Sequence, residues 1–350
     1  KQLWLKYLLA HCQRGLVQAR VHPPSMQYHL LSYSILCKAL AALSGASASV
    51  LPPSVEIAPG VLMPRIIMNA YPNSAGWVQV GGRGMDAALD YGDARQKEMG
   101  HAVTSSGLPR SEFFVTTKVP CCPTGPFCQD NPTHQACVPF LPAPNCDVSR
   151  NTTADIQHDL DIIGVDYVDL LLLHFPCNNW ENTVRTWRVL EAAALSGKAR
   201  AIGVSNFNRT DVEKLVAVAQ VPPAVNQAGF AIGSPQNATM GRDWSTIKRC
   251  RELGITYEAY GSFGESHSTV PTSKVDVLND PVVKRVAARN NRSAALVAYR
   301  WTVQHGMVLL GSSSKSVHMR EDLGIFEFEL SDADMAELDA VGMDTLTIEV

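Results

Sequence analysis

The chain has 350 residues, of which 46% are hydrophobic and 18% charged, and its formal net charge at pH 7 is −3. This composition supports a sizeable buried core and excludes a mainly disordered protein. The small acidic excess argues against a general nucleic-acid binder and against an anionic membrane as principal partner, because both require a surplus of Lys and Arg. After position 50 no uncharged apolar run reaches the roughly 18 residues that a membrane-spanning helix needs.

Residues 1–53 differ in composition from the rest and form an N-terminal extension. The segment 30–50 is apolar and rich in Ala and Ser, with Lys38 as its only charged residue, and an Ala-Ser-Ala sequence at 46–48 resembles a cleavage site. A secretory or organellar leader, an ordinary amphipathic helix and a translation artefact all remain open. The regular pattern of the folded domain is expected from residue 54 onward.

From Pro64 onward, short apolar runs alternate with amphipathic runs. The run 166–175 is continuously apolar at its centre, as expected of a parallel strand buried on both faces. Several amphipathic runs end on Gly, a frequent residue just after a helix. Strands are predicted at 65–71, 84–89, 113–119, 166–175, 199–206, 223–229, 255–260 and 307–312, and helices at 152–164, 181–197, 209–220, 242–254 and 293–306.

Eight strand-helix units over this length predict a closed (β/α)8 barrel spanning 54–350. A doubly wound open sheet is the alternative. It favours a Gly-x-Gly-x-x-Gly sequence after the first strand, and this chain has none there.

The segment 121–150 is a Cys- and Pro-rich insertion after the third strand, without helical or strand periodicity. Disulfides, free thiols and a zinc site are all compatible with it, although paired Cys-x-x-Cys spacing is absent. Its position on the barrel rim suggests a lid or wall of a pocket. Its cysteines are Cys121, Cys122, Cys128, Cys137 and Cys146.

Four polar residues fall at or just beyond the C-terminal ends of three consecutive strands, where (β/α)8 barrels carry their chemistry. Asp86 and Tyr91 follow the second strand, Lys118 ends the third and His174 ends the fourth. Taken singly, each has an ordinary structural explanation, such as a helix cap or a buried core histidine. Lys118 at the end of an apolar strand, however, requires a carboxylate partner.

With these residues in this order, the chain resembles the aldo-keto reductase family from Ser54 to its C-terminus. The segments that carry the resemblance are GGRGMDAALDY, VTTKV, IGVDYVDLLLLHFP, GKARAIGVSNF, PAVNQ, SAALVAYRW and FEFELSDADMAELDA.

The resemblance implies roles for particular residues, with no metal required. Asp86, Tyr91, Lys118 and His174 match the catalytic tetrad, and Tyr71 and Phe175 line the substrate pocket. The resemblance also implies three groups of cofactor-binding residues. The first binds the nicotinamide carboxamide, the second provides the aromatic ring that stacks on the nicotinamide together with the segment after it, and the third forms the phosphate loop. In this order they are Ser205, Asn206 and Gln227; Tyr260, Gly261 and Phe263; and Ser312, Ser313, His318, Glu321 and Asp322.

The chemistry explains these residue types. Hydride delivery to a carbonyl places negative charge on oxygen, so an acid must lie within hydrogen-bonding reach. Tyr91 is expected to be this acid, and Lys118 favours its anion while Asp86 holds Lys118 in place. His174 is expected to orient the substrate oxygen as a neutral imidazole.

The phosphate loop departs from the family pattern. Where NADPH-preferring members place Lys-Ser and an Arg, this chain has Ser312, Ser313 and His318. Lys315 and Arg320 could substitute for them. NADPH is expected ahead of NADH because of the resemblance alone.

The resemblance also implies a monomer, a small-molecule carbonyl substrate and an open pocket for small aldehydes and ketones. It favours a cytoplasmic location, whereas the N-terminal extension and the Cys-rich insertion favour a secretory or organellar one. The rival functions are a redox-inactive, cofactor-binding regulatory protein and a hydrolase or isomerase that uses His174 and Asp86.

Overall fold

A computed structural model describes residues 53–70, 72–121, 151–177, 179–234, 236–264 and 271–343. The chain divides into two compact units, residues 1–51 and 52–350, and the described residues all belong to the second. The predicted leader, Tyr71 and the four cysteines between 122 and 146 lie outside the described residues.

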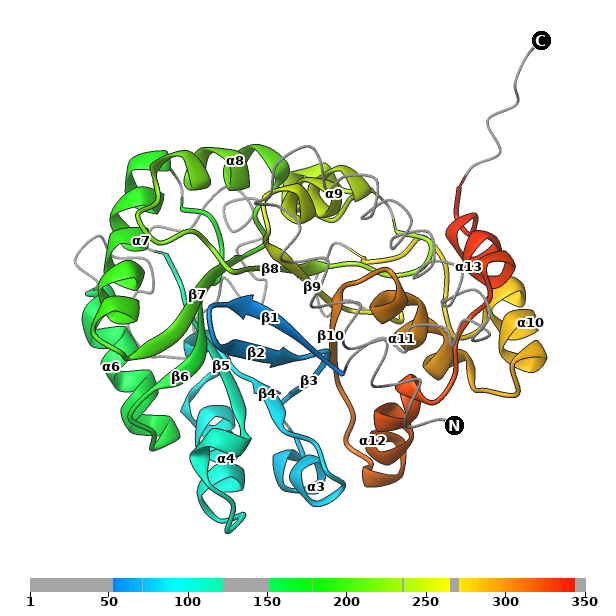
Figure 1. Cartoon of the computed structure of the whole chain (residues 1–350), viewed down its shortest axis with the longest axis horizontal. Helices are drawn as coiled ribbons and strands as arrows, with labels where there is room; N and C mark the ends of the chain where they lie inside the picture. Colours follow the sequence, from blue (N-terminus) through cyan, green and yellow to red (C-terminus); the bar gives the residue numbers. More distant parts are fainter. Residues whose placement is uncertain are drawn as a thin grey trace, which may run out of the picture. The chain divides into compact units, whose positions relative to one another are not determined.

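Eight parallel strands close into a barrel in the order β10-β3-β4-β5-β6-β7-β8-β9 (Figure 1). This confirms the predicted (β/α)8 architecture, and each predicted strand contributes one strand of the barrel. The strands are β3 (Ile66–Asn69), β4 (Gly84–Asp86), β5 (Phe114–Val119), β6 (Val168–Leu173), β7 (Ala199–Ser205), β8 (Val225–Gly229), β9 (Thr256–Tyr260) and β10 (Val308–Gly311).

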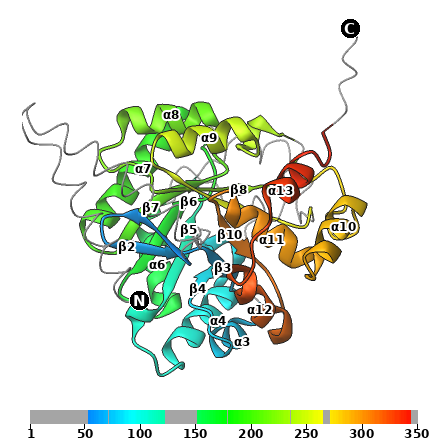
Figure 2. The same cartoon turned by 45° about the vertical axis from the view of Figure 1, so that its right-hand side comes forward.

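Helices surround the barrel, and Figure 2 brings forward those near the C-terminus. None in the described ranges is long and apolar enough to span a bilayer. The α-helices are α3 (Ser74–Gln79), α4 (Asp93–Thr104), α6 (Thr152–Ile163), α7 (Trp180–Leu195), α8 (Arg209–Val218), α9 (Trp244–Glu252), α10 (Pro281–Arg289), α11 (Ala294–Gln304), α12 (Ser316–Asp322) and α13 (Asp332–Asp339), and the short 3-10 turns are η2 (Leu89–Tyr91), η3 (Arg110–Glu112), η4 (Ala238–Met240) and η5 (Leu323–Phe326).

The ends of the predicted helices follow from capping chemistry. Each of the five begins where an Asn, Asp or Ser side chain accepts a hydrogen bond from a backbone amide of the first turn. At the other end of α6, Gly164 adopts φ 75°, a left-handed conformation that glycine accepts without penalty. The N-caps are Asn151, Asn179, Asn208, Asp243 and Ser293.

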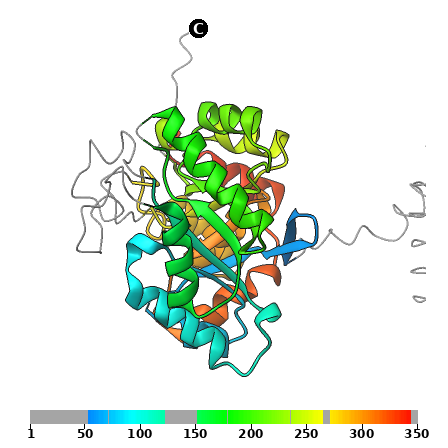
Figure 3. The same ribbon diagram turned by 90° about the vertical axis from the view of Figure 1, so that its left-hand side faces the viewer.

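An antiparallel hairpin that the sequence analysis did not predict precedes the barrel, formed by β1 (Ser54–Ala58) and β2 (Val61–Pro64). Its apolar side chains share one hydrophobic core with residues early in the barrel strands, such as Phe114 and Val308. Arg200, near the start of β7, donates to the Gly60 carbonyl at 2.9 Å. The hairpin therefore packs on the N-terminal end of the barrel (Figure 3), opposite the end at which the predicted site residues lie.

Candidate active site

A buried ion pair joins β4 to β5. Asp86 is the last residue of β4 and pairs in register with Thr116, so that Lys118, two residues further along β5, faces the same interior. Lys118 Nζ contacts an Asp86 carboxylate oxygen and donates to the Ala87 carbonyl at 3.0 Å, and both charged side chains are fully buried. Burial alone would lower the pKa of Lys118, but the adjacent Asp86 carboxylate outweighs it and raises that pKa.

Tyr91 lies against the ammonium group. It ends the short turn η2, and its hydroxyl is 3.5 Å from Lys118 Nζ. Burial raises the pKa of Tyr91 to about 12, while the charge on Lys118 acts in the opposite direction. The phenol is therefore fully protonated at neutral pH and available as a proton donor.

His174, directly after β6, completes the group of four. Its ring meets Tyr91 edge-on with centroids 5.5 Å apart and stacks on Phe175 at 4.7 Å. Its Nδ1 lies 2.8 Å from an Asp90 oxygen, and both side chains are about 5% exposed. The structure thus brings the predicted tetrad together, and it adds Asp90, which the sequence analysis did not identify.

Two further residues extend the buried polar cluster. Gln227 on β8 donates from Nε2 to Asp86 Oδ2 at 3.0 Å and to Glu258 Oε2 at 2.8 Å. Burial, with the nearby charge of Asp86, raises the pKa of Glu258 to about 8. Glu258 was not predicted from the sequence, although the alternation along β9 places it on the same face as Tyr260.

Ser205 and Asn206 lie at the end of β7, beside this cluster. Asn206 has φ 60°, and its backbone amide donates to the Gln227 carbonyl at 2.8 Å. Its side-chain nitrogen donates to the His174 carbonyl at 3.2 Å, and the Ser205 hydroxyl donates to the Gln227 carbonyl at 2.8 Å. After glycine, Asn is one of the residue types that most readily adopt this left-handed conformation.

Tyr260 is held by its hydroxyl. The hydroxyl donates to Asn206 Oδ1 and accepts from Arg242 Nη2, both at 2.7 Å. Arg242 is 1% exposed, with its guanidinium 5.4 Å from the Tyr260 ring centroid. Arg242 was not predicted from the sequence, because no local pattern identifies it as the partner of a strand residue 18 positions later.

The turn after β9 offers a buried hydroxyl. Gly261 and Gly264 have positive φ values of 70° and 82° and turn the backbone around Ser262. Ser262 is 5% exposed, and its Oγ has no hydrogen-bond partner among the described residues. Phe263 stacks on Tyr299 with centroids 4.8 Å apart. A turn of this kind, with an unsatisfied hydroxyl, suits a polar ligand.

The loop after β10 carries the predicted phosphate-binding residues on its surface. Asn73, at the start of α3, donates to the Ser314 carbonyl at 3.1 Å and so connects this loop to the helix. Burial, with the charge of Glu321, raises the pKa of Asp322 to about 7. The exposed residues are Ser312, Lys315, His318, Arg320 and Glu321, whereas Ser313 is partly buried and Asp322 is buried.

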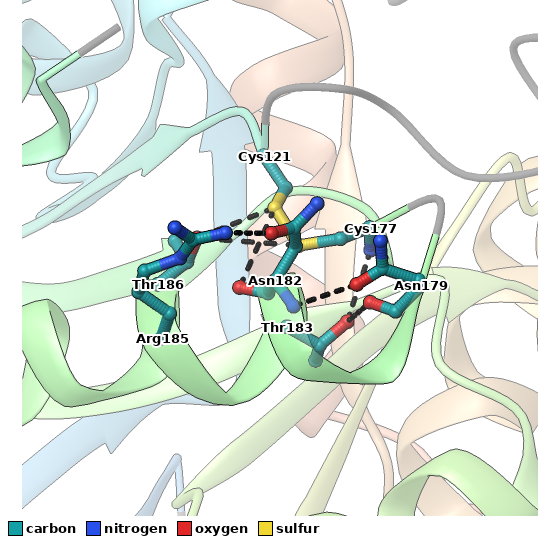
Figure 4. The surroundings of a disulfide bond; sticks show 7 residues. All are labelled: Cys121, Cys177, Asn179, Asn182, Thr183, Arg185 and Thr186. Atoms are coloured by element: carbon teal, nitrogen blue, oxygen red, sulfur yellow. Dashed lines mark hydrogen bonds between the residues drawn. A yellow bond between two sulfur atoms is a disulfide. The ribbon is translucent and has the colours of Figure 1, made fainter. Parts of the chain in front are cut away.

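Cys121 forms a disulfide with Cys177, which lies outside the Cys-rich insertion (Figure 4). The pair lies beside the first turns of α7, where the Cys177 amide donates to Thr183 Oγ1 at 3.2 Å and Thr186 Oγ1 is 3.3 Å from Cys121 Sγ. The disulfide therefore ties the chain just after β5 to the chain just after β6. No cluster of His, Cys, Asp or Glu suited to a metal occurs in the described ranges.

Comparisons with known proteins agree with this geometry. The family model described as "Aldo/keto reductase family" matches residues 74–342. The chain is 31% identical to a morphine 6-dehydrogenase of Pseudomonas putida over 300 aligned residues. The aligned region covers 82% of this chain and 90% of that protein. It is 32% identical over 268 residues to a glyoxal reductase of Bacillus subtilis, over 76% of this chain and 81% of that protein.

A solved aldo-keto reductase from a Medee basin deep-sea metagenome superposes with a TM-score of 0.66 at 25% identity, covering 84% of this chain and 97% of that one. The family match, the relatives and the closed barrel all lead to the same assignment. The chain belongs to the aldo/keto reductase family.

Proposed function

We propose that this protein reduces small aldehydes and ketones to alcohols with NAD(P)H, and that Tyr91 protonates the carbonyl oxygen. The family and its oxidoreductase members support carbonyl reduction in general. The observation that carries the finer proposal is the fully buried Lys118, in contact with Asp86 and 3.5 Å from the Tyr91 hydroxyl.

Each group in this cluster has a task in carbonyl reduction. Tyr91 donates its proton to the oxygen as negative charge develops there, and Lys118 stabilises the resulting phenolate. Asp86 fixes Lys118 and offsets the desolvation of its charge. Phe175, stacked on His174, forms an apolar wall beside the reacting carbonyl.

The residues present fit a nicotinamide dinucleotide, which supplies the hydride when it is bound. Ser205, Asn206 and Gln227 offer amide and hydroxyl groups to a carboxamide, and Tyr260 offers a ring to stack on. The unpartnered Ser262 hydroxyl, in its turn after β9, suits the polar linkage of such a cofactor. Phe263 and Gly261 hold the shape of that turn.

We propose NADPH ahead of NADH. The basic side chains available to a 2′-phosphate are on the loop after β10 and in α12, namely Lys315, His318 and Arg320, all of them exposed. Glu321 and the buried Asp322 provide acceptors nearby for a ribose or base. This arrangement replaces the Lys-Ser and Arg expected of NADPH-preferring members of the family.

The proposed substrates are small carbonyl compounds. One relative is named for glyoxal, a small dicarbonyl, and another for morphine, a larger alcohol. We expect compact aldehydes and bulky ones to be reduced at comparable rates, and a strong preference for steroids would contradict this.

The decisive experiment is the Tyr91→Phe variant. We expect kcat for aldehyde reduction to fall by about a hundredfold or more, the usual contribution of a general acid, because the phenyl ring keeps the shape and loses the proton. The measurement follows oxidation of NADPH, and separately of NADH, with a short aliphatic aldehyde and with benzaldehyde. Cofactor binding, followed by fluorescence, should stay near its original strength.

The outcomes separate the rival functions. Full activity in Tyr91→Phe would show that another group donates the proton. Binding of both cofactors without turnover by the unaltered protein would favour a redox-inactive regulatory role, and absence of binding would remove the reductase proposal altogether.

A further inference from the structure

We propose that Asp90 is a positioning residue that fixes His174 with its proton on Nδ1, so that His174 assists carbonyl reduction as an imidazolium rather than as a neutral ring. This inference rests on the proposed reductase function and deepens it. It concerns a residue adjacent to Tyr91 in the sequence, with no role in the chemistry assigned so far.

The contact is close and enclosed. His174 Nδ1 and Asp90 Oδ1 are 2.8 Å apart, with about 5% of each side chain exposed. The imidazole is confined on two further sides, by the edge-on Tyr91 ring and by the stacked Phe175. The second Asp90 oxygen, Oδ2, is buried without a hydrogen-bond partner among the described residues. With Asp90 ionised, its carboxylate only accepts hydrogen bonds, and the proposal therefore assigns a proton to Nδ1.

The Nδ1 donor determines what the other ring nitrogen can do. A neutral imidazole carries one proton, and when this proton is on Nδ1 the Nε2 atom has a lone pair. A lone pair repels a carbonyl oxygen and offers it no hydrogen bond. His174 can donate to the substrate oxygen from Nε2 only when both nitrogens are protonated. The tautomer selected by Asp90 is thus incompatible with the neutral donor expected from the sequence.

Asp90 is the charged group in direct contact with His174. Asp90 and Tyr91 face the ring from η2, and Asp86, Lys118 and Tyr260 lie around Tyr91. Glu258 is a further carboxyl, linked to Asp86 through Gln227. Asp86 and Lys118 form one ion pair, and a His174 ring protonated on both nitrogens would form a second with Asp90.

Both reaction directions then pass through the same state of His174. In reduction, hydride adds to the carbonyl carbon, the Tyr91 proton moves to the oxygen, and His174 keeps both of its protons while donating one hydrogen bond. In alcohol oxidation these steps reverse: the Tyr91 phenolate takes the hydroxyl proton, hydride leaves the carbon for the oxidised dinucleotide, and His174 again donates from Nε2. Reduction should therefore weaken at alkaline pH, where the ring loses one of its two protons.

The first test reads the tautomer directly and does not depend on turnover. The full chain is labelled with isotopic nitrogen in histidine, and His174→Gln identifies the resonances of His174. We expect Nδ1 to remain protonated in both charge states of the ring. In Asp90→Leu, the neutral ring should carry its proton on Nε2 instead. A neutral His174 protonated on Nε2 in the unaltered protein would overturn the inference.

The second test compares pH profiles of kcat/KM for aldehyde reduction in the unaltered protein, Asp90→Asn and Asp90→Leu. In the unaltered protein we expect a fall of about tenfold or more as the imidazolium loses its proton, which is the scale of one charge-assisted hydrogen bond. Asp90→Asn keeps an acceptor without the charge, so this fall should move to lower pH. Asp90→Leu frees Nε2 to donate from a neutral ring, so its profile should be flatter.

An unchanged profile in an active Asp90→Asn enzyme would refute the role of Asp90 and leave the reductase function intact. Loss of the function itself would instead be seen as failure of the unaltered protein to oxidise either cofactor, and the tautomer measurement would still decide the inference in that case. If Asp90→Leu does not fold, Asp90→Asn alone provides the comparison with the unaltered protein.

Discussion

Lys118 is the only cation in direct contact with the buried carboxylate of Asp86 among the described residues. Glu258, linked to Asp86 through Gln227, adds a second carboxyl whose pKa burial raises to about 8. Burial thus favours the protonated form of Glu258, so that Lys118 faces chiefly the carboxylate of Asp86. The need of Lys118 for a carboxylate was predictable from its place in an apolar strand, because a buried unpaired charge is costly.

Removing Lys118 should destabilise the protein by leaving Asp86 buried and unpaired. We expect Lys118→Met to lower the free energy of unfolding by about 3–5 kcal/mol, the usual cost of breaking a buried ion pair. The double variant Lys118→Met with Asp86→Asn should recover part of this loss, because no charge remains. Urea unfolding at pH 7 measures both. Equal losses in the single and double variants would show that packing, and not charge, is responsible.

Asp90, Arg242 and Ser262 were not predicted from the sequence, and the reason is common to all three. The role of each can be recognised only from its contacts or its burial, and residues at other positions in the chain create both. Asp90 meets a histidine 84 positions away, and Arg242, just before α9, meets the tyrosine at the end of β9. Single-residue chemistry gives no signal for such pairs.

At the scale of elements, β5 directs successive side chains to two different environments. Lys118 faces the barrel interior, whereas its neighbour Thr117 faces the helices and donates to Asp159 Oδ2 on α6 at 2.7 Å. Gln96 on α4 donates to the other oxygen, also at 2.7 Å. The two helices approach closely because α4 has a glycine, Gly100, where any side chain would collide with the Ile163 carbonyl.

Asp159 makes this junction sensitive to pH. Burial raises the pKa of Asp159 to about 7, although the hydrogen bonds from Gln96 and Thr117 act to lower it. Because the folded pKa lies above the unfolded value, the stabilising effect of the protonated acid is complete below about pH 4 and is lost as the pH rises through 7. Asp159 therefore favours folding less at pH 8 than at pH 5.

The variant Asp159→Asn removes this titration. We expect its free energy of unfolding, relative to the unaltered protein, to increase by about 2–3 kcal/mol between pH 5 and pH 8. Urea unfolding at several pH values measures the difference. The matched control is Asp161→Asn on the exposed side of the same helix, which should show no such trend. A constant difference for Asp159→Asn would mean that this carboxyl is ionised throughout.

At the scale of the whole molecule, the barrel is closed at one end by the hairpin β1–β2 and carries its polar cluster at the other. The Cys121–Cys177 disulfide lies at the end that carries the polar cluster. It joins two residues 56 positions apart and so closes a loop of that length. Cys121 and Cys177 each follow a tetrad residue, Lys118 and His174, by three positions. The disulfide thus connects two of the strands that deliver these groups.

Breaking the disulfide should lower stability through the entropy of the unfolded chain. We expect Cys177→Ala to reduce the free energy of unfolding by about 3–4 kcal/mol under oxidising conditions, the value for a loop of this length. With a reducing agent present, the difference from the unaltered protein should shrink to the loss of side-chain packing. Cys250→Ala, at a buried free cysteine, is the control, and its effect should not depend on the reducing agent. An equal effect of Cys177→Ala in both conditions would exclude a bridge in solution.

The sequence by itself determined the barrel and the positions of most polar residues at its rim. Strand and helix periodicity, capping residues and terminal glycines act over a few neighbouring residues, so they can be recognised without the fold. The hairpin was missed, although Pro59-Gly60 between two apolar runs is a typical turn.

Only the tertiary structure decided which side chains meet. The pairing of Asp90 with His174, of Cys121 with Cys177 and of Gln227 with both Asp86 and Glu258 joins residues on different strands and turns. Such contacts depend on barrel closure and on the side to which each strand turns its residues, because a shift of one position in register exchanges interior and exterior. Local sequence patterns predict that the barrel closes, but they do not specify which side chains closure brings into contact, and so the polar contacts of the site were decided by the fold.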